Sequence, residues 1–176
     1  MTTLHRVPNM GRDVVRDAPI DMAWLHPDRD IVRPVYLVIT HASYRNHWAI
    51  NWEMAPRIGA DPGLVRRIHV VRERVGHREL SYLTNWGPIT GAPGSSPQTT
   101  HIPLAKLSLK ARRALEAIAI VEEVFLPERG TEWDCQDWLT SVLLKAVHQG
   151  IISKEQVRVA VNSAKSAPTA VTRNTR

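Results

Sequence analysis

The predicted strands all precede the predicted helices along this chain. The β-rich runs at residues 35–40 and 47–52 predict two strands that form a hairpin, and the runs at 67–72 and 80–84 predict two further strands. From Ser108 onward, apolar residues recur at helical spacing. This segregation of strands and helices predicts an α+β fold in which an antiparallel sheet packs against helices.

The second half of the sequence predicts three helices. The first starts at Ser108, and Pro127 lies beyond its end. The second starts near Asp134. The third follows Ser153, where Gln156 is placed to complete a capping box.

The length of 176 residues allows one domain with a core of its own. We expect an N-terminal arm over residues 1–30, a single domain over 31–162 and a disordered tail over 163–176, where small polar residues dominate. The stretch 87–97 is rich in glycine and proline, which predicts a mobile loop within the domain.

Charge and cysteine content exclude several classes of function. The formal net charge is +6 and the pI about 10, but lysine and arginine are scattered and no base-stacking motif occurs, so we expect no nucleic-acid partner. Cys135 is the only cysteine, which excludes a disulfide within the chain and a zinc site of paired cysteines. No apolar run approaches the roughly 20 residues that cross a bilayer, and the first residues lack the apolar region of a secretory signal. We expect a cytoplasmic protein with no transmembrane segment; the sequence leaves its oligomeric state open.

Cys135 lies at the start of the second predicted helix. The first turn of a helix leaves N–H groups unpaired and carries partial positive charge, which lowers the pKa of a thiol, more so beside a histidinium. The same N–H groups can hold an oxyanion after attack on a carbonyl. The acidic neighbours Asp134 and Asp137 oppose a low pKa, and a buried structural thiol is the alternative interpretation.

Two of the eight histidines lie on neighbouring predicted strands. A thiol nucleophile needs a base within hydrogen-bond reach and a third group that orients the base. His47 begins the second strand and His69 lies inside the third, so antiparallel pairing can place both side chains on one face. The alternative is a pair of ordinary strand histidines with hydrogen-bonded rings, and the spacing alone favours it.

Three short motifs, taken together, resemble a known superfamily. They are Asn46-His47-Trp48-Ala49-Ile50, Ile68-His69-Val70 and Asp134-Cys135-Gln136-Asp137-Trp138-Leu139. Their order is similar to the permuted branch of the NlpC-type papain-like superfamily, which includes lecithin:retinol acyltransferase-like proteins and PPPDE-type isopeptidases. Over about residues 35–150 the chain looks closest to small fungal proteins with a His-Trp-Ala strand and an Asn-Cys-Gln-Asp-Trp helix start.

The resemblance implies a circularly permuted papain-like fold and catalytic roles for three residues. By this resemblance Cys135 is the nucleophile, His47 the base and His69 the residue that orients the base. Asp134 stands where the family usually has asparagine. Aspartate caps a helix equally well, but its charge raises the pKa of the neighbouring thiol.

Four tryptophans and one glutamine near these motifs are candidate substrate contacts, with a place in the core or in solvent as the alternative. They are Trp48, Trp52, Trp133, Trp138 and Gln136. Nothing in the spacing of the cysteine and histidines selects a metal, and no phosphate-binding glycine motif occurs, so we expect no cofactor.

We interpret the sequence as a cysteine-dependent acyl-transfer enzyme, whether hydrolase, acyltransferase or cyclase, that acts on a small-molecule, lipid or peptide acyl substrate. One alternative is a non-catalytic module that binds a small molecule or a peptide on the same fold. Another is a cyclase or isomerase that uses the same pocket without covalent attachment.

Overall fold

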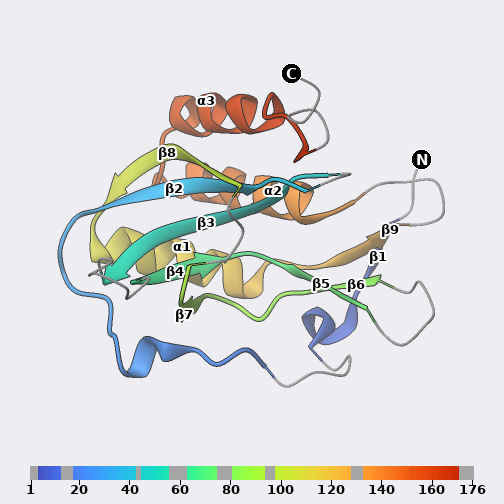
Figure 1. The fold of residues 1–176 in the computed structure, drawn as a ribbon, viewed down its shortest axis with the longest axis horizontal. Coiled ribbons are helices and arrows are strands. Elements are labelled where there is room, and N and C mark those ends of the chain that lie inside the picture. Colours follow the sequence, from blue (N-terminus) through green and yellow to red (C-terminus); the bar gives the residue numbers. More distant parts are fainter. Residues whose placement is uncertain are drawn as a thin grey trace.

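The computed structural model describes residues 4–12, 18–42, 45–55, 63–74, 81–93, 98–127 and 133–170. Its centre is a five-stranded antiparallel sheet with the strand order β7-β4-β3-β2-β8 (Figure 1). The strands of this sheet are β2 (Arg33–Thr40), β3 (His47–Ala55), β4 (Leu64–Ile68), β7 (Ile89–Gly91) and β8 (Thr99–Leu107).

Three helices follow, so the predicted α+β class is confirmed. They are α1 (Leu109–Val121), α2 (Cys135–His148) and α3 (Lys154–Lys165). The predicted capping box of Ser153 and Gln156 is present, and at the start of α1 the Ser108 hydroxyl accepts the first-turn N–H of Ala111 at 3.3 Å. No helix among the described residues combines the length and the apolar composition needed to cross a membrane.

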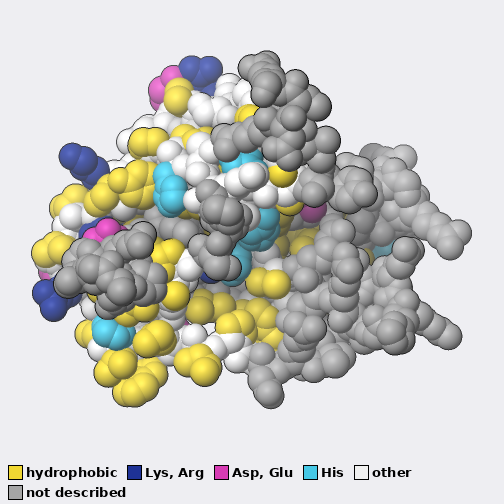
Figure 2. Space-filling model, viewed as in Figure 1, with side chains coloured by type: hydrophobic (Ala, Val, Ile, Leu, Met, Phe, Trp, Pro, Cys, Tyr) yellow, Lys and Arg dark blue, Asp and Glu magenta, His cyan; other side chains and the backbone are white. Residues whose placement is uncertain are grey.

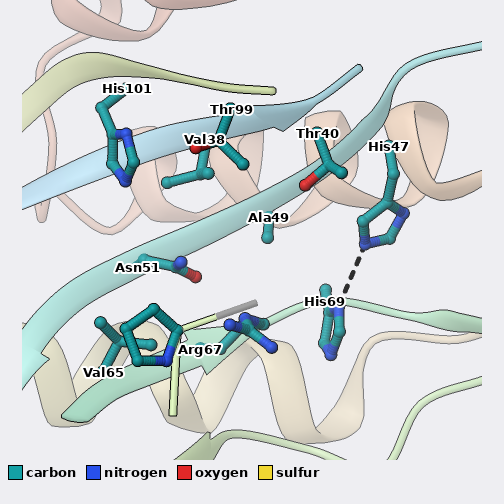
Figure 3. A pocket seen from close by; sticks show the side chains of 11 residues that line it. Val38, Thr40, His47, Ala49, Asn51, Val65, Arg67, His69, Thr99 and His101 are labelled. Carbon is teal, nitrogen blue, oxygen red and sulfur yellow. Dashed lines mark hydrogen bonds between the residues drawn. The ribbon is translucent and has the colours of Figure 1, made fainter. Parts of the chain in front are cut away.

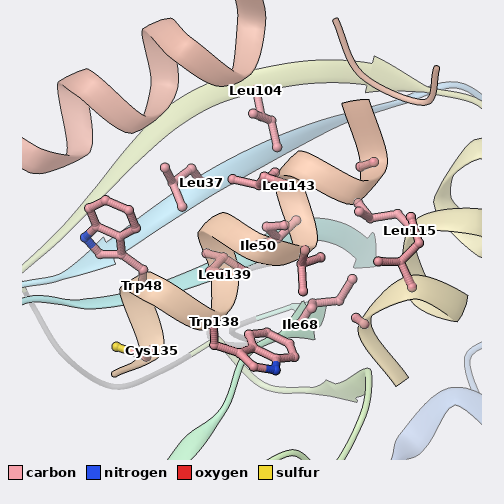
Figure 4. Close-up of a cluster of buried hydrophobic side chains, with 14 of the residues drawn as sticks. Leu37, Trp48, Ile50, Ile68, Leu104, Leu115, Cys135, Trp138, Leu139 and Leu143 are labelled. Carbon is pink, nitrogen blue, oxygen red and sulfur yellow. The ribbon is translucent and has the colours of Figure 1, made fainter. Parts of the chain in front are cut away.

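Two helices cover one face of the sheet, and the third lies along its β8 edge. Figure 1 shows α1 and α2 behind the strands, with α3 beside β8. Leu37 of β2 and Trp48 and Ile50 of β3 are at most 1% exposed, and they pack in one cluster with Leu139 and Leu143 of α2 (Figure 4). Each such side chain contributes roughly 1.5–3 kcal/mol to folding when fully buried. The alternate residues of β2 and β3 therefore face away from α2.

The predicted hairpin of β2 and β3 is confirmed, with Thr40 opposite His47. The predicted third strand is wrong in its bounds, because the run 67–72 is divided between β4 and β5 (Val71–Arg74). The adjacent apolar residues Val70 and Val71 break the two-residue alternation, and the chain leaves the five-stranded sheet at the same place. β5 instead pairs with β6 (Ser81–Thr84), the fourth predicted strand.

The sequence pattern does not predict β8. This strand contains Pro103, which lacks the N–H of a regular ladder, and a proline is tolerated in a strand at the edge of a sheet. Its register against β2 shifts between Val35 and Tyr36. The remaining short elements are equally without a sequence signal: β1 (Leu4–Arg6), which pairs with β9 (Phe125–Pro127), and the 3-10 helices η1 (Pro8–Gly11) and η2 (Met22–Trp24).

The N-terminal arm is fastened to the domain by two ion-pair clusters. Arg112 of α1 is 0% exposed and donates to both carboxylate oxygens of Asp28 at 2.7 and 2.8 Å. Arg66 of β4 donates to Asp21 at 2.9 Å and to Glu116 of α1 at 2.7 Å. The arm is therefore part of the folded unit over the described residues 18–30.

The predicted disordered tail is wrong for residues 163–170. α3 continues to Lys165, Ala164 is 2% exposed, and the Asn46 side-chain amide donates to the carbonyl of Ala167 at 3.1 Å. A hydrogen bond of 2.6 Å also joins His41 Nδ1 to the carbonyl of Pro168. Small alanines bury against the sheet here, which a composition rich in polar residues conceals. Residues 171–176 lie outside the described part of the chain.

Candidate functional site

A small pocket lies on the face of the sheet that is turned away from α2. Successive side chains of a strand point to opposite faces, so residues 47, 49 and 51 of β3 face this pocket while Trp48 and Ile50 face the core. The cavity volume is about 320 Å³. Its polar lining includes Thr40, His47, Asn51, Arg67, His69 and His101 (Figure 3). Figure 2 shows histidine side chains gathered near the middle of this face.

His47 and His69 form a hydrogen-bonded pair at one end of the pocket. The distance from His47 Nε2 to His69 Nδ1 is 3.0 Å, and the dashed line in Figure 3 marks this bond. The prediction that both side chains share one face is therefore confirmed. One ring must donate and the other accept, so a proton on His47 Nε2 leaves His47 Nδ1 free to act as a base. His47 Nδ1 has no hydrogen-bond partner within the described part of the chain.

Both histidines are held in the neutral form. Burial, followed by the positive charge of Arg67, lowers the pKa of His47 to about 4. Burial, followed by the charges of His47 and Arg67, lowers the pKa of His69 to about 3. A charged imidazole loses its hydration in this pocket, and no described carboxylate replaces it. At neutral pH the pair is thus two neutral imidazole rings joined by one hydrogen bond.

The depressed pKa values predict a loss of stability in acid. Below about pH 6.5, the ordinary histidine pKa, the unfolded chain binds protons that folded His47 and His69 do not bind until about pH 4 and 3. The free energy of unfolding should therefore decrease as the pH is lowered through this window, by up to about 1.4 kcal/mol per pH unit for each ring. Urea denaturation between pH 7 and 4.5 measures this slope. His69→Gln should flatten this slope, and an equal slope in the variant and the wild type would contradict the assignment.

The first turn of α2 docks on the start of β3 through three successive contacts. Asp134 forms an ion pair with Arg45, and Gln136 Nε2 donates to the carbonyl of Asn46 at 2.8 Å. Between them, the backbone N–H of Trp48 is directed at the sulfur of Cys135 and favours its thiolate. These contacts bring the cysteine beside the backbone of the residues that flank His47.

The thiol of Cys135 is nevertheless protonated at neutral pH. It is 9% exposed, and burial raises its pKa to about 11, against the opposing N–H of Trp48. The charge of Asp134 adds to the increase, and Arg45 offsets part of it. The helix terminus therefore does not lower the pKa of this cysteine, because desolvation outweighs it.

The N–H groups of the first turn of α2 are largely occupied. The Asp134 carboxylate accepts from the backbone of Gln136 at 2.8 Å and also from Asp137, whose own carboxylate accepts from the Asp134 backbone at 3.0 Å. Asp137 thus closes a capping box. Gln136, predicted to contact substrate, instead fixes the start of β3. An oxyanion at this position is left with the N–H of Cys135 and that of Trp48.

The structure brings His47 and His69 together but does not join them to Cys135. No hydrogen bond links the Cys135 sulfur to His47 in the described part of the chain, and the cysteine does not line the pocket. Catalytic hydrogen bonds often form only when substrate is bound, so the missing hydrogen bond does not by itself decide the role of the pair.

The tryptophans predicted to contact substrate lie in the core. Trp48, Trp52 and Trp138 are each 1% exposed, and Trp133 is half-buried against Phe125. The indole N–H of Trp52 is bound to Asp28 at 3.0 Å. These side chains occupy the face opposite to the pocket or the helices behind it, which corrects their predicted place in a substrate site.

Sequence reasoning missed Asn51 and Arg67. They lie directly opposite each other in the antiparallel pairing of β3 and β4 and both line the pocket. The alternation of side chains along a strand could have identified them. Asn51 is an even number of residues from His47, and Arg67 from His69, so each lies on the same face as its histidine. Asn51 is buried and Arg67 is half-buried, and polar side chains at such positions mark a candidate site.

Fold and site together define an α+β protein with a neutral histidine pair in a pocket on an antiparallel sheet and a buried cysteine at the helix start behind it. Among the described residues, no group of three His, Cys, Asp or Glu side chains is arranged to hold a metal ion. No family model matches the sequence, and comparisons with curated proteins and with solved structures gave no match.

Proposed function

We propose that this chain is a cysteine-dependent acyl-transfer enzyme of the cytoplasm, built on a circularly permuted papain-like fold. The observation that carries the proposal is the docking of the first turn of α2 on the start of β3, beside a histidine whose other ring nitrogen is already bound to His69. The order of histidine strand, histidine strand and cysteine helix supports the fold assignment. Cys135, His47 and His69 take the roles of nucleophile, base and orienting residue.

The neutral resting state determines how the thiol is activated. With the pKa of Cys135 at about 11 and that of His47 at about 4, a resting thiolate–imidazolium ion pair is strongly disfavoured. The proton must therefore pass from sulfur to His47 Nδ1 as the sulfur attacks. Serine nucleophiles use a base in the same manner. His69 holds His47 in the required tautomer by accepting the proton of Nε2.

The reaction then follows the two halves of acyl transfer. The sulfur forms a bond to the carbonyl carbon, and the backbone N–H groups of Cys135 and Trp48 stabilise the oxyanion. The carbon–leaving-group bond breaks, His47 returns the proton to the leaving group, and a thioester remains on Cys135. Water, an amine or an alcohol attacks the thioester and gives its proton to His47. The carbon–sulfur bond then breaks, His47 returns this proton to the sulfur, and the acyl product leaves the free thiol. The acyl donor is an ester, thioester or isopeptide.

Acyl transfer to Cys135 is expected with activated acyl donors. Incubation with a panel of p-nitrophenyl esters of different chain length should add one acyl group to the wild type, detected by intact mass. Cys135→Ala should form no adduct, and His47→Ala should acylate about 10²–10⁴-fold more slowly, the usual contribution of a general base. His148→Ala is the control, because this exposed histidine ends α2 and does not line the pocket. Equal adduct formation in Cys135→Ala would reject the cysteine as nucleophile.

A second candidate is a proton-transfer or binding function without covalent attachment. It is favoured by one observation, that the pocket is lined by His47 and His69 and not by Cys135. The two candidates separate in the same variants: activity or binding that survives Cys135→Ala and is lost in His47→Ala supports the non-covalent function.

A further inference from the structure

The pocket contains a cation without a described counter-charge. Arg67 is half-buried, and among the described residues its guanidinium makes one long hydrogen bond, 3.5 Å from Nη2 to the carbonyl of Ala92. No carboxylate among the described residues pairs with it. Burial lowers the pKa of Arg67, yet an arginine stays charged in proteins. A partly desolvated charge of this kind is costly unless something else meets it.

The neighbouring arginine shows what this fold does with a structural cation. Arg66 points to the other face of β4, and two carboxylates meet it, from Asp21 at 2.9 Å and Glu116 at 2.7 Å. Arg112 of α1 is likewise matched by Asp28. Arg67 differs from both, although it lies in the same strand as Arg66. The difference indicates a site kept open for an anion.

Asn51 supplies a second unsatisfied group at the same place. It is the cross-strand partner of Arg67, so the two side chains are neighbours on the pocket face, as Figure 3 shows. Asn51 is 7% exposed, and its Oδ1 is buried without a hydrogen-bond partner within the described part of the chain. A buried amide oxygen without a donor costs about 1–3 kcal/mol. A ligand that places a donor here removes that cost.

We propose that the pocket binds a small monocarboxylate that carries a hydroxyl or amide N–H next to its carboxylate. Arg67 would hold the carboxylate through two parallel hydrogen bonds, and Asn51 would accept the donor. A single cation beside two neutral histidines fits one negative charge; a phosphate dianion would bring a second charge with nothing to meet it. Val38, Ala49 and Val65 give the pocket an apolar wall for the rest of the molecule.

This ligand class is consistent with the proposed acyl transfer and, in naming its substrate, rests on it. Arg67 and His69 are two residues apart on the same face, which corresponds to about 6.5 Å along a strand. A carboxylate on Arg67 therefore lies only a few bonds from a carbonyl beside the histidine pair. The cavity of about 320 Å³ is at the small end of ligand pockets. The acyl donor would be a compact acid such as an N-acyl amino acid, whose amide N–H can donate to Asn51.

Binding is tested in Cys135→Ala, so that no turnover intervenes and failure of the acyl-transfer proposal leaves the result readable. N-acetyl-L-valine and its neutral analogue N-acetyl-L-valinamide are titrated into the labelled protein and followed by amide NMR shifts. The acid should bind at least tenfold more tightly than the amide, and its shifts should map to β3 and β4. The same titration with a panel of small monocarboxylates and with inorganic phosphate determines the preferred anion.

Two variants identify the residues responsible. Arg67→Gln should weaken binding of the acid at least tenfold and leave the amide unchanged. Asn51→Asp, which is nearly isosteric and supplies an internal counter-charge to Arg67, should do the same even if Arg67→Gln is poorly folded. Lys106→Gln removes one exposed charge from β8 and should alter binding less than twofold. Equal binding of acid and amide, binding unaffected by both pocket variants, no binding by any monocarboxylate, or tighter binding of phosphate would each overturn the proposal.

Discussion

The thiol of Cys135 is expected to react with iodoacetamide about 30-fold more slowly at pH 7.5 than the thiol of an unstructured peptide. A pKa near 11, in place of the ordinary value of about 8.5, lowers the thiolate population roughly 300-fold. The greater basicity of the thiolate recovers about tenfold of this. The sulfur is also buried, so restricted access lowers the rate further.

The pH dependence and one variant separate the two modes of activation. Because the resting thiol is neutral and is not bonded to His47, His47→Ala should change the alkylation rate less than about threefold, while it lowers the rate of acylation by about 10²–10⁴-fold. Intact mass is an unambiguous measurement, since the chain has a single cysteine. The denatured protein serves as the control and should react as a free thiol.

Fast alkylation at acidic pH that disappears in His47→Ala would contradict this expectation. It would mean that Cys135 and His47 form a thiolate–imidazolium pair, which the burial of both groups opposes. Slow alkylation together with no acylation by any donor would instead favour the non-covalent function of the pocket.

Replacing Arg112 with alanine is expected to lower the free energy of unfolding by about 3–5 kcal/mol, the usual consequence of removing one partner of a buried ion pair. The guanidinium is 0% exposed and makes five hydrogen bonds, two to Asp28 and one each to the carbonyls of Arg29, Ile31 and Leu107. The variant leaves a buried carboxylate whose remaining partners include the indole N–H of Trp52.

Urea denaturation at pH 7 measures this loss, and the next residue is the matched control. Arg113 is exposed and pairs with Glu116 only one helical turn away, at 3.4 Å. Arg113→Ala should therefore cost no more than about 0.5 kcal/mol. A similar effect of the two substitutions would show that the link between the N-terminal arm and α1 does not stabilise the fold.

The histidine pair could be predicted from sequence, and Cys135's environment could not. His47 begins β3 and His69 directly follows β4, so the alternation of these strands indicates which face each histidine takes, and antiparallel pairing brings the two together. The pKa of Cys135 depends on desolvation by residues distant in the chain. A helix start predicts a lower value, and packing against β3 reverses its sign.

Arg67 likewise has one property that the sequence predicts and another that only packing decides. Its parity assigns it to the face of His69, but the sequence Arg66-Arg67 gives no reason to treat the two arginines differently. Only the assembled sheet places Arg66 against Asp21 and Glu116 and leaves its neighbour facing a pocket. The prediction of a disordered tail is wrong for a related reason, because Ala164 becomes buried only when α3 packs on the rest of the domain.

The sequence by itself determined the α+β class, the β2–β3 hairpin, the capped starts of the three helices and the shared face of the two histidines. These properties depend on hydrogen bonding and periodicity within a few residues, or between strands whose pairing the periodicity constrains. Tertiary structure alone decided the position of β8, the place of the tryptophans in the core, the neutral state of the thiol and the lack of a described carboxylate beside Arg67. Burial and charge pairing depend on contacts between residues far apart in the chain, and these contacts form only when the sheet and the helices pack together.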